Sequence, residues 1–285
     1  MIPVDAYALF TGYATLLGLL VGSFLNVCIG RMPEDRSVVS PPSHCPACGH
    51  AIRWTDNIPV LSWLILRAKC RDCGTPISSL YPTIELLTGA LAFVLWRSVV
   101  PGPEALDLAH AAAFGVYLLF TSMLVAVTFI DIRHYIIPDE FSIYAVPFGV
   151  AACALLTHLG YPGAPTWQQS VLGALAGGGG LFAVMAGWKL LRGQEGMGLG
   201  DVKLLAMIGA FLGVAPAVPM VIVIASVAGS LVGVPLALLT RKRLHLALPF
   251  GPFLALGALA WLLHGDALLG VYLHYIERMY FLMHG

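Results

Sequence analysis

Long apolar stretches separated by short polar loops dominate the chain. Seven of them approach the ~20 residues that an α-helix needs to cross a bilayer. These are Tyr7–Val27, Leu80–Trp96, Ala109–Ile130, Ser142–His158, Ser170–Trp188, Pro219–Thr240 and Ala247–His264. Leu204–Val214 is shorter, and Ala267–Met283 carries two charges, so that it could span the membrane or lie in its interface. The pattern predicts an all-α polytopic membrane protein with about eight transmembrane helices.

The composition supports this class of protein. Hydrophobic residues make up 59% of the 285 residues and charged residues only 11%, whereas a soluble domain carries about 25% charged residues. The net charge of zero gives no electrostatic support for a nucleic-acid partner. The lipid bilayer is therefore the expected surroundings of the chain.

Loops rich in Lys and Arg alternate along the chain with loops that lack them, and this alternation predicts the orientation of the protein in the membrane. The first loop is rich in them, the loop at 160–166 has none, and Lys189, Arg192 and Lys203 come next. The first apolar stretch lacks the basic start and the cleavage site of a signal peptide. We therefore expect the N-terminus outside, with the first loop and the loop before Asp201 on the cytoplasmic side.

The first loop is the one substantial polar segment and contains two Cys-x-x-Cys pairs. The pairs are Cys45 with Cys48 and Cys70 with Cys73, and a glycine follows each. This spacing is typical of a tetrahedral Zn²⁺ site. We predict three parts: a first transmembrane helix over 1–28, a cytoplasmic zinc-binding loop domain over 29–79, and a membrane domain over 80–285.

The four cysteines could instead form two disulfides, but a cytoplasmic location argues against that. A site with four cysteine ligands has no open position for a substrate. The expected zinc is therefore structural and holds the loop together.

Acids inside or beside membrane segments are costly and so are candidates for function. Asp131 ends one apolar stretch and Asp201 begins another, and both are expected at cytoplasmic helix ends. Two carboxyl groups that share a confined site can activate water against a peptide carbonyl. Asp139 and Glu140, which follow Pro138, are interpreted as acids at a helix start that the helix dipole stabilises.

Three glycines, Gly196, Gly198 and Gly200, precede Asp201. Glycine permits backbone geometries closed to other residues and lets a substrate backbone come close. A dinucleotide-binding fingerprint is excluded, because its last glycine would fall on Asp201 and no βαβ unit surrounds it. We therefore expect these glycines to form a substrate groove beside Asp201.

Several motifs resemble the type IV prepilin peptidases, membrane aspartic proteases that are also called leader peptidase/N-methyltransferases. "GMGLGDVKLLAMIGAFLG" is similar to their Gly-x-Gly-Asp signature. "GSFLNVCIGRMP", the paired cysteines, "YPTIELLTG", "IDIRHYIIPD" and "PFGPFLALGA" resemble further family motifs. The resemblance extends over nearly the whole chain.

The resemblance implies that Asp131 and Asp201 are the catalytic acids. It also implies that the substrates are prepilins and pseudopilins, cleaved between a basic leader and an apolar helix at the cytoplasmic face of the bacterial inner membrane. Members with the cysteine loop methylate the new N-terminus with S-adenosylmethionine. Asn26, Arg31 and Glu85 are polar candidates for binding this methyl donor, with packing or snorkelling as their alternative role.

Two other classes of membrane protein remain as alternatives. An ion-coupled transporter would use glycine-rich breaks and midplane acids, but no internal repeat is present and both acids are expected at one face. A presenilin-like intramembrane protease shares Gly-x-Gly-Asp and a proline motif. The paired cysteines and the "ID…PD" motif favour the prepilin peptidase class.

Overall fold

The computed structural model describes the backbone of residues 4–193, 197–240 and 248–284. Over these ranges the regular elements are helices, and strand-like pairing is limited to two isolated bridges, His44 with Ala51 and Lys69 with Pro76. The chain divides into two compact units, an N-terminal unit (residues 1–138) and a C-terminal unit (residues 139–285).

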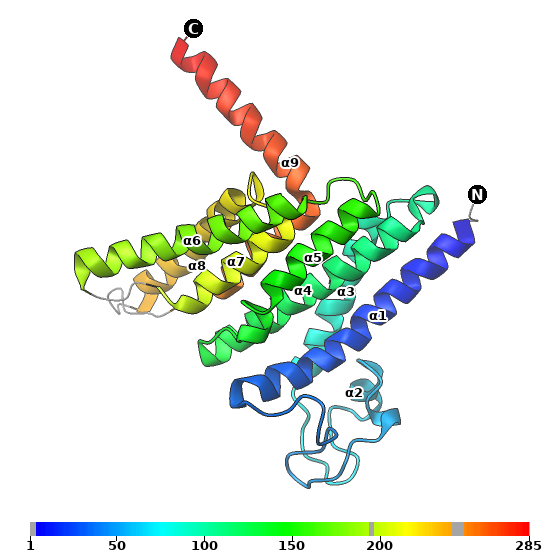
Figure 1. Cartoon of the computed structure of the whole chain (residues 1–285). Helices are drawn as coiled ribbons and strands as arrows, with labels where there is room; N and C mark the ends of the chain where they lie inside the picture. The colour runs from blue at the N-terminus through cyan, green and yellow to red at the C-terminus, as the bar shows by residue number, and fades with distance from the viewer. Residues whose placement is uncertain (1–3, 194–196, 241–247, 285) are drawn as a thin grey trace. The chain divides into compact units, whose positions relative to one another are not determined.

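Three long helices form the N-terminal unit: α1 (Val4–Arg31), α3 (Leu80–Val99) and α4 (Leu108–His134). α1 packs closely along α3 (Figure 1). The approach is close because a glycine faces α3, and a Cβ added to Gly22 would lie 2.7 Å from the Cα of Glu85. Near the far end of the pair, the Tyr7 hydroxyl donates a 2.6 Å hydrogen bond to the Val100 carbonyl. These contacts fix the register of the two helices.

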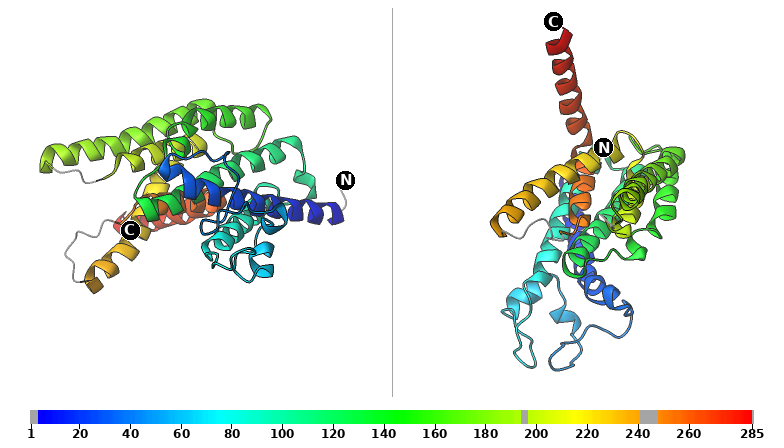
Figure 2. Two further views of the ribbon diagram at one scale, coloured as in Figure 1. Left: turned by 90° about the horizontal axis from the view of Figure 1, so that it is seen from below. Right: turned by 90° about the vertical axis from the view of Figure 1, so that its left-hand side faces the viewer.

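The polar insert between α1 and α3 contains only short elements. They are η1 (Met32–Glu34), η2 (Trp54–Asp56) and α2 (Leu61–Ile65). Figure 2 shows the loops of the insert gathered at one end of α1 and α3. A segment of this size cannot build a sufficient apolar core by itself, so its fold depends on cross-links and on the helices that carry it.

The C-terminal unit begins with η4 (Asp139–Phe141) and continues through five helices. These are α5 (Ala145–His158), α6 (Trp167–Arg192), α7 (Leu199–Leu212), α8 (Ala217–Thr240) and α9 (Gly251–His284). α7 packs along α6 and also contacts α5, while α8 packs on α9 (Figure 1). α6 and α7 meet at Gly173 and Gly209, where a Cβ on either residue would overlap the backbone of the other.

Local sequence signals set the helix ends. The Asp107 carboxylate accepts a 2.9 Å hydrogen bond from the His110 N–H and caps the start of α4. Thr166 and Gln169 form a capping box at the start of α6. α6 ends at Gly193, whose φ of 69° is the left-handed conformation that glycine adopts without strain.

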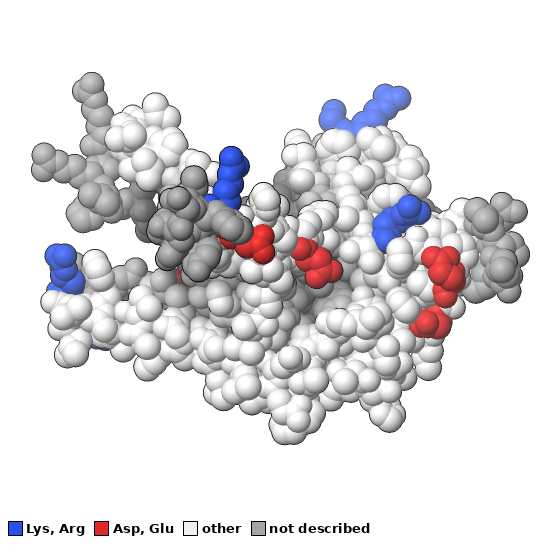
Figure 3. Space-filling view, turned by 90° about the horizontal axis from the view of Figure 1, so that it is seen from above, with Lys and Arg blue, Asp and Glu red and all other residues white. Residues whose placement is uncertain are grey.

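The predicted fold class is confirmed. The described residues contain eight α-helices of 14 residues or more, and six of the helical segments are long and apolar enough to cross a membrane. The face in Figure 3 is mostly uncharged, with a few charged groups. The sequence predicted two separate segments over 247–264 and 267–283. The structure instead has one kinked helix, α9, that contains the described part of both. Its backbone leaves helical geometry at His264, next to Gly265.

Candidate functional site

The four cysteines of the insert lie together in space. Their sulfur atoms are all within 4.8 Å of one another, and Cys45 Sγ is 3.8 Å from Cys73 Sγ. A tetrahedral zinc site with Zn–S bonds of about 2.3 Å has sulfur–sulfur edges of about 3.8 Å. Cys45, Cys48, Cys70 and Cys73 therefore fit a metal ion in both number and spacing.

The two Cys-x-x-Cys segments form the same backbone turn twice. Cys45 N–H donates to the His50 carbonyl, and Gly49 N–H donates back to the Cys45 carbonyl, both at 2.9 Å. The second segment repeats this pattern: Cys70 N–H donates to the Thr75 carbonyl at 2.8 Å, and Gly74 N–H donates to the Cys70 carbonyl at 3.0 Å. The two glycines have φ of 73° and 71°, which a residue with a Cβ adopts only at a cost. Each glycine thus closes a turn that directs two sulfurs inward.

Hydrogen bonds lower the thiol pKa of two of the four cysteines, which favours the binding of a cation. The hydroxyl and backbone N–H of Thr75 lower the pKa of Cys73 to about 6, and the backbone N–H groups of Cys48 and Ala47 lower the pKa of Cys45. The pKa of Cys48 rises to about 12: the His50 backbone opposes this, but desolvation and the neighbouring thiols outweigh it. A bound cation would be needed to hold all four sulfurs as thiolates.

The three polar candidates for the methyl donor have different surroundings. Asn26 donates from its amide to the carbonyls of Gly22 and Tyr81, at 3.2 and 3.1 Å. The Glu85 carboxylate is buried and accepts a 2.7 Å hydrogen bond from the Val60 N–H in the insert. Both side chains thus have packing or tethering contacts. Arg31 is the one that lines a cavity.

That cavity has a volume of about 200 Å³ and lies in the insert. Its lining residues are Arg31, Arg36, Ser37, Ser40, Pro41 and His44. The Arg31 guanidinium donates a 3.0 Å hydrogen bond to the Ser37 carbonyl, which uses one of its five N–H groups. Its remaining donors can bind an anionic group.

Asp131 lies in the last turn of α4 and is buried. Its carbonyl accepts a 3.0 Å hydrogen bond from Tyr135, whose φ of 56° ends the helix in a left-handed cap. The sequence "IDIRHYIIPD" is therefore a helix end, a tight cap and a short connection to η4. This arrangement explains why Asp131 and Asp139 have different surroundings although they belong to one motif.

Asp201 is the third residue of α7 and is also buried. Gly198 is the N-cap of the helix with φ of −75° and ψ of 144°, a conformation open to any residue. The expectation of a special backbone geometry is therefore not met at Gly198. What this glycine leaves is space, since a Cβ there would lie 3.7 Å from the Asp201 carboxylate. Gly200 is the second helical residue, and Gly196 lies outside the described residues.

An ion pair near Asp201 escaped the sequence analysis. Lys203 Nζ lies 2.6 Å from the carboxylate of Asp139. Asp139 does lie in the first turn of η4, as expected. It also pairs with Lys203, which the sequence analysis did not predict. A signal was present: Lys203 is a lone cation in an apolar run, and a cation in such a run needs a partner. The pair links the beginning of α7 to the segment that precedes α5.

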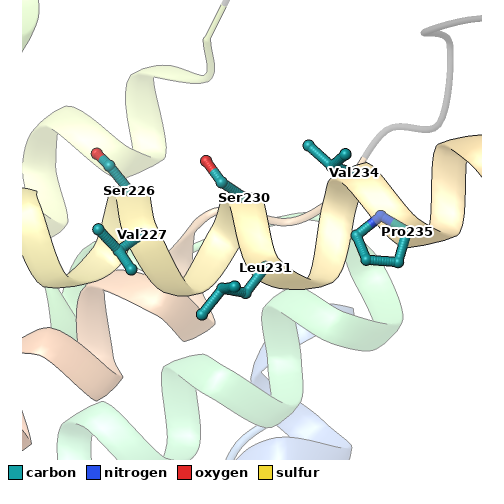
Figure 4. A pocket seen from close by; sticks show the side chains of 6 residues that line it. All are labelled: Ser226, Val227, Ser230, Leu231, Val234 and Pro235. Atoms are coloured by element: carbon teal, nitrogen blue, oxygen red, sulfur yellow. The ribbon is translucent and has the colours of Figure 1, made fainter.

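A second cavity, of about 450 Å³, follows one side of α8. Ser226 and Ser230 lie one turn apart, with Val227, Leu231, Val234 and Pro235 completing the lining (Figure 4). The lining contains no acid, base or thiol. This cavity therefore offers no catalytic group.

Comparison with known proteins identifies the family. The profile of the Bacterial Peptidase A24 N-terminal domain matches residues 16–99, and that of the Type IV leader peptidase family matches residues 118–234. The Aeromonas hydrophila protein named prepilin leader peptidase/N-methyltransferase is 38% identical over 289 residues, covering 93% of this chain and 94% of the relative. No solved structure was found to match.

Other relatives with the same name agree. The Burkholderia pseudomallei (strain 1026b) protein is 40% identical over 92% of this chain and 90% of its own length. The Stutzerimonas stutzeri protein is 34% identical over 96% of this chain and 99% of its own length. The chain belongs to the type IV leader peptidase family. The resemblance seen in the motifs is confirmed, and the transporter and presenilin-like alternatives are set aside.

Proposed function

We propose that this protein is a membrane aspartic endopeptidase that removes the basic leader of type IV prepilins and pseudopilins. Asp131 and Asp201 are its catalytic pair. The observation that carries the assignment is that both acids are buried at helix ends and match the acids of the family's motifs. A buried carboxyl group without a function would be a net cost to a membrane protein.

The proposed reaction uses one water and two carboxyl groups. The carboxylate takes a proton from water as the oxygen attacks the scissile carbonyl, and the other carboxyl group donates its proton to the carbonyl oxygen. As the tetrahedral intermediate collapses and its C–N bond breaks, the acid that took the proton of water gives it to the departing amine, and the other carboxylate recovers a proton from a hydroxyl of the intermediate. The products are the leader with a new carboxyl terminus and the pilin with a new amine.

We assign the ionised form of the free enzyme to Asp201. It is in the first turn of α7, where the partial positive charge of the helix N-terminus stabilises an anion. The proton donor is then Asp131. Gly198 keeps a side chain away from the buried Asp201 carboxylate, and Gly198, Gly200 and Gly196 are proposed to form the groove through which a substrate backbone reaches it.

The cysteine cluster is proposed to hold a structural Zn²⁺, and the insert that it holds together is proposed to take part in the second activity of the chain. In that activity S-adenosylmethionine would supply a methyl group to the new α-amine. Such an amine has a pKa of about 8 and needs little activation beyond orientation. Arg31 in the insert cavity suits the carboxylate of this donor, whereas Arg36 is paired with Glu34.

A multi-pass protein of the bacterial inner membrane fits the six apolar helices and the family. We propose that the N-terminus lies outside and that the insert and both acids lie at the cytoplasmic face. The basic leader of a prepilin would then meet the acids without crossing the bilayer. The predicted division into residues 1–28, 29–79 and 80–285 stays a prediction.

Co-expression with a prepilin tests this function. The mature pilin is expected to lack its leader and to be heavier by one methyl group, with the methyl on its N-terminal nitrogen. The control is an Asp201→Asn variant that accumulates in the membrane to the same level. An uncut prepilin with the wild-type enzyme would contradict the proposed cleavage, and a cut but unmethylated pilin would contradict only the transferase activity.

A further inference from the structure

The insert exposes an apolar face that no described residue covers. Leu61, Leu64 and Ile65 are 55%, 57% and 71% exposed, and their spacing puts them on one side of α2. Trp54, in the adjoining η2, is 82% exposed. Four large apolar side chains on a short polar insert are a signal for a binding partner, because such groups are unfavourable in water.

The opposite side of α2 is fixed to the rest of the insert. The Ser62 hydroxyl donates to the Thr55 carbonyl at 3.0 Å and accepts from the Ile58 N–H at 2.9 Å. The Trp63 indole N–H donates to the Ile77 carbonyl at 3.1 Å. A five-residue helix is not stable alone, so these bonds hold α2 in place. The exposed apolar face of α2 therefore has a fixed orientation relative to the rest of the insert.

A hydrogen bond fixes the position of α2 relative to α3. The Val60 N–H, at the N-cap of α2, donates to the carboxylate of Glu85 on α3. Glu85 lies five residues beyond the start of α3 at Leu80, or roughly 7.5 Å along the helix. The neighbouring helix α1 carries a candidate membrane span, Ala6–Glu34, and its Gly22 packs against the backbone of Glu85. α2 is thus held against the pair of α1 and α3 near the end at which the insert leaves α1.

Basic residues follow this apolar face directly. Arg67 and Lys69 are exposed, and among the described residues neither forms an ion pair. The neighbouring acids are neutralised within the insert, Asp56 by Arg71 and Asp72 by Arg53. Apolar side chains flanked by unpaired cations are typical of a segment that lies in the interface of an anionic membrane.

We propose that α2 and Trp54 form an interfacial membrane anchor. Leu61, Leu64, Ile65 and Trp54 enter the boundary between headgroups and acyl chains, and Arg67 and Lys69 contact lipid phosphates. The occupant of the face is the bilayer that α1 and α4 of the same unit are long and apolar enough to cross. The anchor holds the insert against the membrane surface. This inference is independent of the catalytic roles of Asp131 and Asp201.

The test is collision measurement on the full-length protein in vesicles of phosphatidylglycerol and phosphatidylcholine. A nitroxide side chain at position 64, introduced through a non-cysteine amino acid to spare the cluster, is compared with one at His50 in the first cysteine turn. We expect position 64 to collide more with oxygen, which concentrates in lipid, and His50 to collide more with a water-soluble nickel chelate. Metal content and leader cleavage confirm folding, and Ile65 is labelled if position 64 does not tolerate the probe.

Two results would overturn the proposal. Nickel accessibility at position 64 equal to that at His50 would mean that α2 faces water. Protection from both oxygen and nickel would mean that protein, whether another part of this chain or a substrate, covers the face. The charge contribution has its own arm: Arg67→Gln with Lys69→Gln should move position 64 outward in anionic vesicles and leave it unchanged in vesicles of phosphatidylcholine alone. Equal effects in both lipids would refute the attraction of Arg67 and Lys69 to anionic headgroups.

Discussion

The ammonium group of Lys203 lies 2.6 Å from the carboxylate of Asp139, which joins the beginning of α7 to η4. Both side chains are partly exposed, at 28% and 44%. A pair with this exposure contributes up to about 1 kcal/mol. We interpret it as an interaction that positions the start of α7, and with it Asp201, and not as part of the chemistry.

Lys203→Met and Asp139→Asn should therefore each slow leader cleavage by at most about fivefold. A double-mutant cycle on the cleavage rate measures the coupling, and the double variant should be little slower than either single variant. Glu140→Gln is the matched control, since Glu140 is adjacent and exposed. Complete loss of cleavage in Asp139→Asn would instead make Asp139 a member of the catalytic pair.

Serine replacements in the cysteine cluster should release the metal. Purified wild-type protein is expected to hold one zinc per chain, and Cys73→Ser should hold much less, because a tetrahedral site loses a quarter of its ligands. Cys28→Ala is the control, since Cys28 is a buried cysteine of α1 outside the cluster. Metal analysis together with proteolysis of the insert checks the result. Wild-type protein without metal but with a protease-resistant insert would refute the zinc site.

The contact between α6 and α7 should be sensitive to a single methyl group. Gly173→Ala places a Cβ against the backbone of Gly209, and such overpacking costs about 1–3 kcal/mol. Gly179→Ala is the control on the same helix, because a Cβ there meets nothing within 4 Å. Thermal unfolding in detergent should show a lower Tm for Gly173→Ala and an equal or higher one for Gly179→Ala. Equal Tm values for all three proteins would contradict the close helix contact.

The orientation can be tested with membrane-impermeant labels. Probes placed at Asp56 and Arg192 should react only from the cytoplasmic side, and probes at Gly102 and Gly163 only from the outer side. An outer location for Asp56 would put the insert on the wrong side of the membrane for a cytoplasmic leader. That outcome would reject the proposed substrate geometry.

The sequence predicted the helical class and the cysteine cluster well, for physical reasons. Apolar stretches of membrane length have few alternatives in lipid, and ligand spacing within a Cys-x-x-Cys turn is a local property. The kink of α9 at His264 was harder to foresee, because no proline marks it. The helix capping at Asp107 and Thr166 follows familiar residue preferences.

Contacts between distant segments were the part that sequence reasoning missed. The partner of Lys203 is Asp139, 64 positions away, and the bond from Val60 to Glu85 spans 25 positions. The backbone of Gly198 also differs from the expectation, since it is extended in a way open to any residue, and its missing Cβ would lie 3.7 Å from the Asp201 carboxylate. Such relations depend on how helices pack, which periodicity and spacing do not specify.

Purified variants acting on a prepilin peptide test whether Asp131 and Asp201 form one catalytic pair. Asp131→Asn and Asp201→Asn are each expected to reduce the cleavage rate to background, and the double variant should be no slower, because the two acids act as one unit. Methylation of a pre-cleaved pilin should persist in all three variants as proof of folding. Cleavage at the wild-type rate by either single variant would contradict the catalytic pairing of Asp131 with Asp201.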